Sequence, residues 1–564
     1  MLKHKWAVRA RPDQERVRQL AEDFGLRPLV VELLVQRGLD DPTEIKKFLH
    51  PQLKDLSDPF LMPQMREAID RIFRAIDDDE TVVIYGDYDV DGVTSVTLLH
   101  GFLKAYGLEA KTFLPHRMDE GYGLNDHGVE RCLKEFSPDL IIAVDCGTSS
   151  VEQVKFLKEQ GIDVIICDHH ECNTPENLPP AVALVNAKLG EDYHYLCTAG
   201  VMFKVGHAML KTRKTANLNL RDWLDIVALG TVADLVPLVD ENRTLVRKGL
   251  QQMERTIHPG LNALKHVAAV AGKPVAYDIG FKLGPRLNAA GRLDTAQASL
   301  ELLMNSDHEK SRELAMFLDG QNRERQDLEA RIREEALGML SNFDESSDFG
   351  IALGHDTWHP GVVGIVASRI TKQFHRPSFI IAFDEDGVGK GSGRSIEGVS
   401  LVAALNSCRD LLLAGGGHEM AAGVSLERKN FEAFRQRFSD YIRDHATKET
   451  LRPRLDIDLV ATFDQLDLQL LDSYELVHPM GMGNPAPLMM SKSIKMADEP
   501  RVLKEKHLKL PLIQNDCRID AMMFNGAVEE LPKLPWDIAY RISRNIYKGR
   551  SSLSVVIEAI RTSE

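Results

Sequence analysis

Acidic residues and histidines gather directly after several short apolar segments of this 564-residue sequence. They are Asp87, Asp89, Asp91, Asp145, Asp168, His169, His170 and Asp234. If the apolar segments are strands and helices of one domain, four separate ends deliver carboxylates and imidazoles to one place. Burying that many acids together without a cation is very costly, so we expect divalent metal ions among them.

The donor types indicate which ions these are. Carboxylate oxygens with one or two imidazoles suit Mn²⁺ or Mg²⁺ better than a structural zinc site, which prefers thiolates. Two ions roughly 3.5–4 Å apart can share a carboxylate, activate a water and stabilise phosphoryl oxygens during in-line attack. The residue types therefore favour a phosphoesterase centre with two divalent metal ions, Mn²⁺ or Mg²⁺.

Two other metal sites have partial support in the sequence. The D-x-D-x-D-G spacing at residues 87–92 resembles the start of an EF-hand loop, but the twelfth loop position is Leu98 instead of Glu. The sequence CDHHEC at residues 167–172 offers zinc-binding residue types, but Cys167 ends an apolar segment and is expected to face the core. Helix capping explains a single Asp at a helix start, but not acidic residues at four ends.

The elements around these residues predict a parallel sheet. Expected strands are Thr81–Tyr85, Leu140–Val144, Asp163–Cys167 and Ala181–Val185, and expected helices between them include Val93–Tyr106 and Val151–Gln160. Continuous apolar strands separated by helices indicate a sheet covered on both faces. Ligands of such sheets bind at the carboxyl ends of the strands, where the acidic residues stand.

The whole chain is expected to be of the α/β class, with further domains. Residues 1–75 show helical periodicity and are expected to pack on a catalytic domain at 76–300. Residues 301–344 predict one long charged connecting helix, and 345–449 predict a second α/β domain with glycine-rich motifs. The two-fold periodicity within residues 450–564 predicts a small β-barrel or sandwich.

Composition places the chain among ordinary soluble proteins. It is 43% hydrophobic and 27% charged, and it holds no apolar run long enough for a transmembrane helix. Seven scattered cysteines do not form a disulfide framework pattern, so we expect a reducing cytoplasm. The formal net charge of −15 argues against a protein that coats nucleic acid, but it allows a strand held in a local basic channel.

The acidic motifs resemble those of the DHH phosphoesterase superfamily, whose naming motif stands here as Asp168-His169-His170. Within it the chain resembles the RecJ family of single-strand-specific 5′→3′ exonucleases, from about residue 45 to the C-terminus. Further matching stretches are GPRLNAAGR (284–292), HPGVVGIVASR (359–369), GSGRS (391–395), GGGHEMAAG (415–423) and GMGNPAP (481–487).

This resemblance implies roles for the acidic residues and histidines. The implied catalytic set is Asp89, Asp91, Asp145, His169, His170 and Asp234, and the implied metal ligands are Asp87, Asp89, Asp91, Asp145, His169 and Asp234. Whether Asp87 and His170 contact the metals directly or support residues that do stays open.

The resemblance also implies that residues 345–449 form the DHH-associated domain, which holds substrate. Glycines there let the backbone approach a phosphate, Ser392 can donate its hydroxyl, and Arg394 can clamp a terminal phosphate. The expected substrate-binding residues are Arg117, Arg286, Ser392, Arg394, Gly416, Gly417 and His418. A structural salt bridge is the alternative for Arg286, and a tight turn is the alternative for the glycines.

The C-terminal region resembles the OB-fold of the family. OB-folds hold single strands with a basic groove and stacking aromatic residues. Candidates are Lys504, Lys506, His507, Lys509, Arg541, Arg544, Tyr547, Lys548 and Arg550. For any one of them, a solvated surface position is the simpler interpretation.

The resulting hypothesis is a single-stranded-DNA-specific 5′→3′ exodeoxyribonuclease that releases 5′-mononucleotides by two-metal hydrolysis. The resemblance implies action in DNA repair and recombination beside single-strand-binding protein and a helicase; we expect a monomer without membrane contact. One alternative is a superfamily phosphodiesterase acting on short oligonucleotides or cyclic dinucleotides, but the C-terminal β-rich region favours a long substrate. The other is a non-catalytic DNA-binding relative, which the retained acidic residues disfavour.

Overall fold

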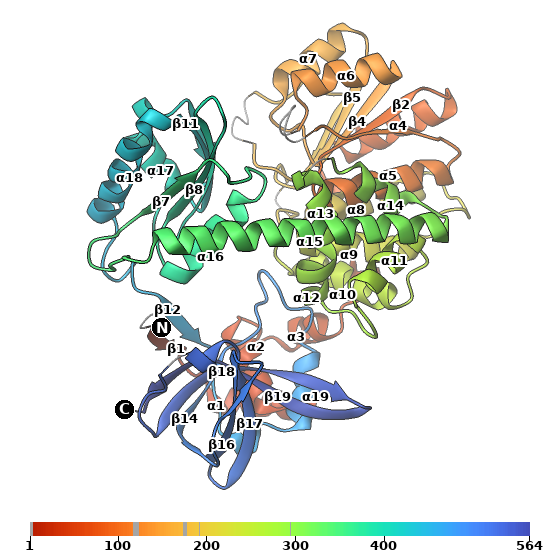
Figure 1. Cartoon of the computed structure of the whole chain (residues 1–564). Helices are drawn as coiled ribbons and strands as arrows, with labels where there is room; N and C mark the ends of the chain where they lie inside the picture. The colour runs from red at the N-terminus through yellow and green to blue at the C-terminus, as the bar shows by residue number, and fades with distance from the viewer. Residues whose placement is uncertain are drawn as a thin grey trace. The chain divides into compact units, whose positions relative to one another are not determined.

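The apolar segments between residues 80 and 190 form a parallel sheet in the order β3-β2-β4-β5-β6. Its strands are β2 (Val82–Gly86), β3 (Lys111–Phe113), β4 (Leu140–Val144), β5 (Asp163–Asp168) and β6 (Ala183–Asn186). The computed structural model describes residues 4–116, 123–172, 177–190, 192–293, 295–528 and 530–563 (Figure 1). The predicted parallel sheet is confirmed, and each predicted strand lies within two residues of an observed one.

Helices cover both faces of this sheet, which explains why β2 and β4 are buried along their whole length. One face packs on α5 (Val90–Ala105) and α8 (Thr198–Thr212), and the other packs on α6 (Asp126–Phe136) and α7 (Val151–Glu159). Further helices of this unit are α4 (Met65–Asp77), α9 (Leu224–Ala233), α10 (Asp240–Glu254), α11 (Pro259–Val267), α12 (Ala276–Asp278), α13 (Gly284–Leu293) and α14 (Gln297–Met304). Helix α9 is apolar on all sides because α5, α8 and α10 surround it.

The predicted connecting helix is present as α15 (His308–Met339), the long helix in the centre of Figure 1. Its residues up to Arg325 belong to the compact unit formed by His50–Arg325 and His478–Pro485. Its residues from Gln326 belong to a second compact unit, which holds most of the rest of the chain.

The second α/β domain is a mixed sheet in the order β10-β11-β9-β8-β7. Its strands are β7 (Ile351–His355), β8 (Ser378–Phe383), β9 (Val388–Arg394), β10 (Ala414–Gly417) and β11 (Ala421–Glu427), and its helices are α16 (Val363–Phe374), α17 (Leu401–Ser407) and α18 (Phe431–His445). The core on one side contains a cluster of phenylalanines from β8 and α18.

The C-terminal domain is a strongly paired β-structure, as the two-fold periodicity predicts. Its strands are β13 (Leu459–Val460), β14 (Met489–Met496), β15 (Arg501–Leu503), β16 (His507–Gln514), β17 (Cys517–Met523), β18 (Trp536–Tyr547) and β19 (Arg550–Thr562), with helix α19 (Leu468–Glu475) before β14. The order is β13-β14-β18-β19-β17-β16-β15, and β14 also pairs with β16. This additional pairing closes a ring of strands.

The N-terminal segment, expected to pack on the catalytic domain as residues 1–75, is divided after Leu49 between the two compact units. Strand β1 (Lys5–Val8) pairs with β12 (Arg454–Ile457), and residues up to Leu49 group with the C-terminal part of the chain. The helices of this segment are α1 (Gln14–Phe24), α2 (Pro28–Gln36) and α3 (Pro42–Leu49). Helix α2 is buried on most sides, partly against α19. Helical periodicity marks an apolar face but does not identify the partner that covers it, and residues from His50 onward group with the sheet that carries the acidic residues.

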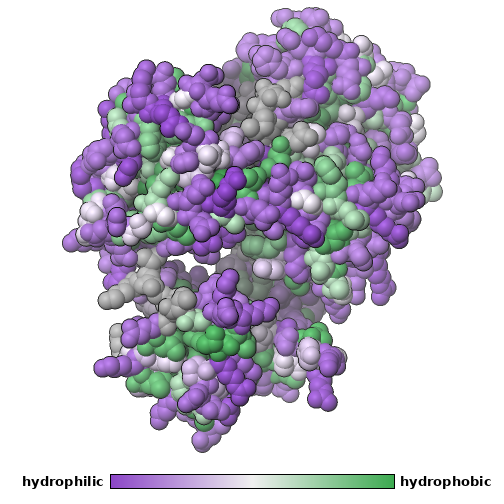
Figure 2. Space-filling model, in the orientation of Figure 1, coloured by the Kyte–Doolittle hydropathy of each residue, from purple (hydrophilic) through white to green (hydrophobic). Residues whose placement is uncertain are grey.

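Hydrophilic residues predominate on the face drawn in Figure 2, with hydrophobic residues in small groups between them. Within the described parts of the chain, every helix is too short or too polar to cross a membrane. All seven cysteines lie in those parts and are free thiols.

Candidate metal centre

The loop between β2 and α5, together with the first turn of α5, carries three carboxylates at the carboxyl edge of the sheet. The Asp89 side chain caps α5 by accepting hydrogen bonds from the backbone N–H groups of Asp91 (2.9 Å) and Gly92 (3.1 Å). A Cβ atom added at Gly92 would lie only 2.4 Å from the carbonyl oxygen of Asp87. The close turn that brings Asp87, Asp89 and Asp91 together therefore requires glycine at this position.

The N-terminus of α8 holds two of the buried carboxylates. Asp91 accepts hydrogen bonds from the backbone N–H groups of Thr198 (2.7 Å) and Ala199 (2.9 Å). The Thr198 hydroxyl donates to Oδ1 of Asp145 (2.9 Å). A helix N-terminus attracts negative charge, so α8 offsets part of the repulsion between these acids. Asp145 itself has a φ of +63°, a strained backbone conformation of the kind found at functional sites.

Asp168 supports the two histidines that follow it. Its Oδ1 accepts from Nδ1 of His170 and from the backbone N–H of His169, both at 2.7 Å. Its Oδ2 accepts from the hydroxyl (2.6 Å) and the backbone N–H (3.1 Å) of Thr148. Although burial raises it, the hydrogen bond and charge of His170 hold the pKa of Asp168 well below its usual value. Asp168 is thus occupied by protein donors and orients His170.

His169 points its Nε2 atom at the carboxylates. This atom lies 3.4 Å from Asp145, 3.5 Å from Asp234 and 3.8 Å from Asp91. Burial lowers the pKa of His169 despite the nearby carboxylates, which favours the neutral imidazole that binds metals.

The ligand atoms fall into three groups, in each of which all atoms lie within 4.8 Å of one another. The groups are Asp87, Asp89 and Asp145; Asp91, His169 and Asp234; and Asp145, His169 and His170. Asp145 and His169 each belong to two groups, so the groups overlap, as two neighbouring ions with shared ligands require. The structure therefore brings together every metal-ligand and catalytic candidate expected from the sequence.

Electrostatics shows that this cluster suits cations. Burial, followed by the charges of Asp91, Asp89 and Asp87, raises the pKa of Asp145 well above its usual value. Burial, followed by Asp91 and Asp89, raises the pKa of Asp234 to about 9. A divalent ion would offset the repulsion between these buried carboxylates and favour their charged form. Oxygen donors with an imidazole are ligands that suit Mn²⁺ or Mg²⁺.

His170 differs from His169 in exposure and in charge. Its side chain is 44% exposed, compared with 12% for His169. Burial opposes its charge, but the hydrogen bond with Asp168 raises the pKa of His170 to about 9. The geometry thus supports a charged imidazole that faces outward from the cluster.

The expected substrate residues of the second domain share a strip of sheet. Ser392 of β9 is in register with Gly423 of β11, which is in register with Gly416 of β10. A Cβ atom added at Gly423 or Gly416 would meet nothing within 4 Å. Register partners point to the same side of a sheet, so this strip exposes bare backbone beside the Ser392 hydroxyl.

Arg394 is the last residue of β9, two positions after Ser392, and its side chain lies beside the start of α16. Its Nη1 donates to Oγ of Ser392 (2.9 Å) and to the carbonyl oxygen of Gly393 (2.8 Å). A Cβ atom at Gly364 would lie 3.0 Å from Ser392 Oγ and 3.5 Å from Arg394 Nη2. Burial lowers the pKa of Arg394, and the first turn of a helix beside it favours an anion.

The remaining substrate candidates have varied positions. Gly417, the last residue of β10, has a φ of +142°, and the exposed His418 donates its backbone N–H to the carbonyl oxygen of Ala421 (2.8 Å). Arg286 donates Nε to Asp319 (2.9 Å), so the salt bridge considered as its alternative role is present. Arg117 lies outside the described residues.

Several basic candidates of the C-terminal domain are also engaged in ion pairs. Arg544 pairs with Asp472 and Glu475 of α19, and Lys509 pairs with Asp520 at 2.8 Å. The hairpin of β18 and β19 instead exposes Tyr547 at its tip, with the Lys548 ammonium 5.5 Å from the ring centroid. This tip is the part of the domain that best combines a basic group with an exposed aromatic ring.

Sequence reasoning missed the groups that support the ligands. Thr148, Thr198 and Ala199 donate to the acidic residues, but isolated threonines and alanines in a sequence do not reveal such contacts. It also missed the position of residues 478–485, which pack on the segment after Asp234 although their sequence neighbours belong to the C-terminal domain. The repeated glycines of GMGN are the one signal of close packing there.

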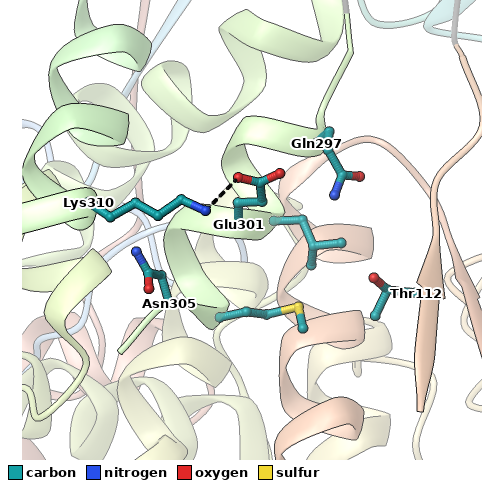
Figure 3. Close-up of a pocket in the computed structure, with 7 residues that line it drawn as sticks. Thr112, Gln297, Glu301, Asn305 and Lys310 are labelled. Atoms are coloured by element: carbon teal, nitrogen blue, oxygen red, sulfur yellow. Dashed lines mark ion pairs between the residues drawn. The ribbon is translucent and has the colours of Figure 1, made fainter. Parts of the chain in front are cut away.

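A pocket of about 200 Å³ lies elsewhere, between β3, α14 and the first turn of α15 (Figure 3). Its lining includes Thr112, Asn305 and an ion pair of 3.4 Å between Lys310 and Glu301. Its lining residues are separate from the carboxylates and histidines of the cluster, so it adds nothing to the metal centre.

Comparisons with known proteins give the same assignment across the chain. Residues 81–231 match the N-terminal domain of the DHH family, 347–444 match the DHHA1 domain, and 457–559 match the RecJ OB domain. The single-stranded-DNA-specific exonuclease RecJ of Bacillus subtilis is 37% identical over all of this chain and 71% of that protein. The protein of the same name from Dickeya dadantii is 35% identical over 95% of this chain and 96% of its own length.

A solved structure agrees with the whole described fold. The crystal structure of RecJ in complex with Mn²⁺ from Thermus thermophilus superimposes with a TM-score of 0.85 at 28% identity. The match covers 100% of this chain and 80% of the Thermus protein. With matched domains in the same order and relatives above 30% identity covered over 71% and 96% of their own length, the chain belongs to the RecJ family of single-stranded-DNA-specific exonucleases.

Proposed function

We propose that this chain is a metal-dependent exonuclease that degrades single-stranded DNA from its 5′ end and releases 5′-mononucleotides. The observation that carries this proposal is the set of three overlapping ligand groups at the carboxyl edge of the sheet. The names of the relatives, single-stranded-DNA-specific exonucleases, support the choice of polymer. The match of the C-terminal region to an OB domain favours a long strand over a short oligonucleotide.

The ligand groups suggest how the residues divide between two ions. Asp87, Asp89 and Asp145 would hold one ion, and Asp91, His169 and Asp234 would hold the other; Asp145 also groups with His169, so it would serve both. When bound, two Mn²⁺ or Mg²⁺ ions supply an activated water and offset negative charge on the phosphoryl oxygens. Thr198 and the N-terminus of α8 keep the inner carboxylates in place before substrate arrives.

His170 has a separate task in this proposal. Its Nδ1 is bonded to Asp168, it is half-exposed, and its pKa of about 9 keeps it charged at neutral pH. A charged imidazole donates a strong hydrogen bond to a phosphate oxygen. His170 therefore contacts the scissile phosphate, and Asp168 maintains its charge.

The second domain holds the end of the strand. Exposed backbone at Gly416 and Gly423 admits a phosphodiester chain without side-chain obstruction. Ser392 and Arg394, beside the first turn of α16, bind the 5′-terminal phosphate, whose extra charge and free oxygens distinguish an end from an internal diester. This arrangement sets the 5′→3′ direction.

The C-terminal domain binds the part of the single-stranded DNA that follows its 5′ end, through Tyr547 and the basic groups around it. Action in DNA repair and recombination beside single-strand-binding protein and a helicase, in the cytoplasm and as a monomer, completes the proposal.

Digestion of matched oligonucleotides labelled at either end tests this function. With Mn²⁺ or Mg²⁺, a 5′-labelled single strand should yield labelled mononucleotide at the earliest time points. A 3′-labelled strand should instead shorten progressively, and a blunt duplex should persist. Early mononucleotide from the 3′ label, internal cuts, or equal digestion with chelator would contradict the proposal.

A further inference from the structure

The segment of residues 478–485 holds GMGN and lies in the catalytic unit, although the chain before and after it belongs to the other unit. In the sequence it lies between α19 and β14. We name this segment the 478–485 loop. A loop that departs from its own domain to join another compact unit needs a reason beyond connecting two elements.

The loop contacts the chain that follows the metal-ligand candidate Asp234. The backbone N–H of Leu238 donates to the carbonyl oxygen of Met482 at 2.7 Å. A Cβ atom at Gly481 would lie 2.8 Å from Leu238 Cδ1, and one at Gly483 would lie 3.0 Å from Pro237 Cβ. Both glycines thus let the loop lie directly on residues 237–239.

A buried arginine fixes the loop from the other side. Arg243 of α10 is 3% exposed, and it donates to the carbonyl oxygens of His478 (3.0 Å) and Pro479 (3.4 Å). Asn484, also buried, donates to Pro479 within the loop (2.7 Å). A guanidinium bonded to two carbonyl oxygens holds the loop more firmly than apolar packing alone.

The segment under the loop is irregular, so it depends on such support. Helix α9 ends at Ala233, Asp234 is its C-cap, and Leu235 has a φ of +62° with its side chain 66% exposed. Helix α10 begins only at Asp240. Asp234 therefore lies at the start of a stretch without regular secondary structure. The hydrogen bond from the backbone of Leu238 to the 478–485 loop is one of the contacts that hold this stretch in place.

We propose that the 478–485 loop and Arg243 are positioning residues for the metal ligand Asp234. The loop holds residues 237–239, and these restrict where the preceding carboxylate can lie. The inference rests on the proposed metal centre but assigns the loop no contact with metal or substrate. Support of a ligand from outside the coordination sphere is commonly worth tenfold to hundredfold in metal affinity.

Gly483→Ala tests the loop, with Gly272→Ala as its matched control. The two glycines have similar φ values, +72° and +68°, so alanine introduces similar backbone strain at each. Only at Gly483 does the new methyl group press on Pro237 and Val239, since Gly272 has nothing within 4 Å. Gly483→Ala should weaken Mn²⁺ binding by roughly tenfold or more, and Gly272→Ala should leave it unchanged.

Arg243→Lys supplies a second test that depends on a different contact. Its control is Arg376→Lys, because Arg376 is also buried and also donates to backbone carbonyl oxygens, but in the second α/β domain. Metal-free melting temperatures identify general destabilisation in either pair. Arg243→Lys should lose Mn²⁺ affinity at a melting temperature similar to that of its control.

Calorimetric titration with Mn²⁺ alone separates the outcomes. Equal Mn²⁺ affinity in Gly483→Ala, Arg243→Lys and both controls would overturn the positioning role. Wild-type protein that binds no Mn²⁺ would overturn both this inference and the proposed function. Wild-type protein that binds Mn²⁺ with the expected differences between variants, but digests no DNA, would overturn the proposed function and sustain the positioning role.

Discussion

Replacing Asp234 by Asn tests whether the carboxylate cluster is built to hold cations. Burial and the nearby acids raise the pKa of Asp234 from 3.8 to about 9, so at pH 7 the metal-free folded protein keeps a proton that the unfolded chain has released. Each pH unit above 3.8 lowers the free energy of unfolding of the metal-free protein by about 1.4 kcal/mol, which amounts to at most roughly 4 kcal/mol at pH 7. Asn has nearly the same shape and needs no proton.

The sign of the effect follows from the direction of the shift. The proton stabilises the folded wild type fully below about pH 4, and this contribution is lost as the pH rises through about 9. Metal-free Asp234→Asn should therefore be more stable than metal-free wild type, by a margin that grows with pH across this window. Excess Mn²⁺ should narrow this margin, since a ligand at 100 times its Kd adds about 2.7 kcal/mol to the stability of the protein that binds it.

Urea unfolding in chelator and in excess Mn²⁺, at about pH 5.5 and about pH 8.5, measures both effects. Asp327→Asn, an exposed change on α15, is the control and should show neither. A metal-free margin of Asp234→Asn that does not grow with pH would refute the raised pKa of Asp234. Equal stabilisation of Asp234→Asn and wild type by Mn²⁺ would refute the role of Asp234 as a metal ligand.

Three further predictions concern the strand, its end and the exposed histidine. Arg394→Ala should lose most of the rate preference for a 5′-phosphate over a 5′-hydroxyl while keeping its Mn²⁺ affinity; an unchanged rate ratio would exclude Arg394 as the end reader. Tyr547→Ala with Lys548→Ala should weaken binding of long single strands, and should lower the log–log salt slope by roughly 0.7 for one lost phosphate contact; unchanged affinity and slope would show that the hairpin tip does not touch DNA. Asp168→Asn should move the high-pH limit of activity from about 9 toward the ordinary value for histidine near 6.5, because His170 loses the partner that keeps it charged; an unchanged pH–rate profile would remove His170 from the proposed contact with phosphate.

The parallel sheet and its acidic edge were predictable because their signals are local. Strands β2, β4 and β5 are continuous apolar runs, and each is followed at once by its polar residues. Parallel strands place their carboxyl ends at one edge, so local runs were enough to predict that Asp87, Asp145 and His169 meet. The order of β3 and β6 around them adds detail without changing the site.

The missing parts depend on contacts between distant residues. The pairing of β1 with β12 joins residues about 450 positions apart, and no periodicity in either short strand indicates its partner. The 478–485 loop likewise packs on residues 237–239 through backbone atoms, which carry no side-chain signal. For Arg286 the residue type alone was not decisive, because an arginine can bind either a phosphate or a carboxylate. In the structure it pairs with the carboxylate of Asp319.

The central claim is that the carboxylate and histidine cluster performs metal-dependent cleavage, and the rate of Asp145→Asn tests it most directly. Asp145 belongs to two of the three ligand groups found among the described residues, and Asn tolerates its left-handed backbone. Loss of a shared ligand should cost several kcal/mol of transition-state stabilisation, on the order of 1,000-fold in rate. The measurement is single-turnover digestion of a 5′-phosphorylated single strand in saturating Mn²⁺, with folding and DNA binding checked on the same protein. A loss of that order in a folded, DNA-binding variant is the predicted result, and a rate within tenfold of wild type would contradict the account.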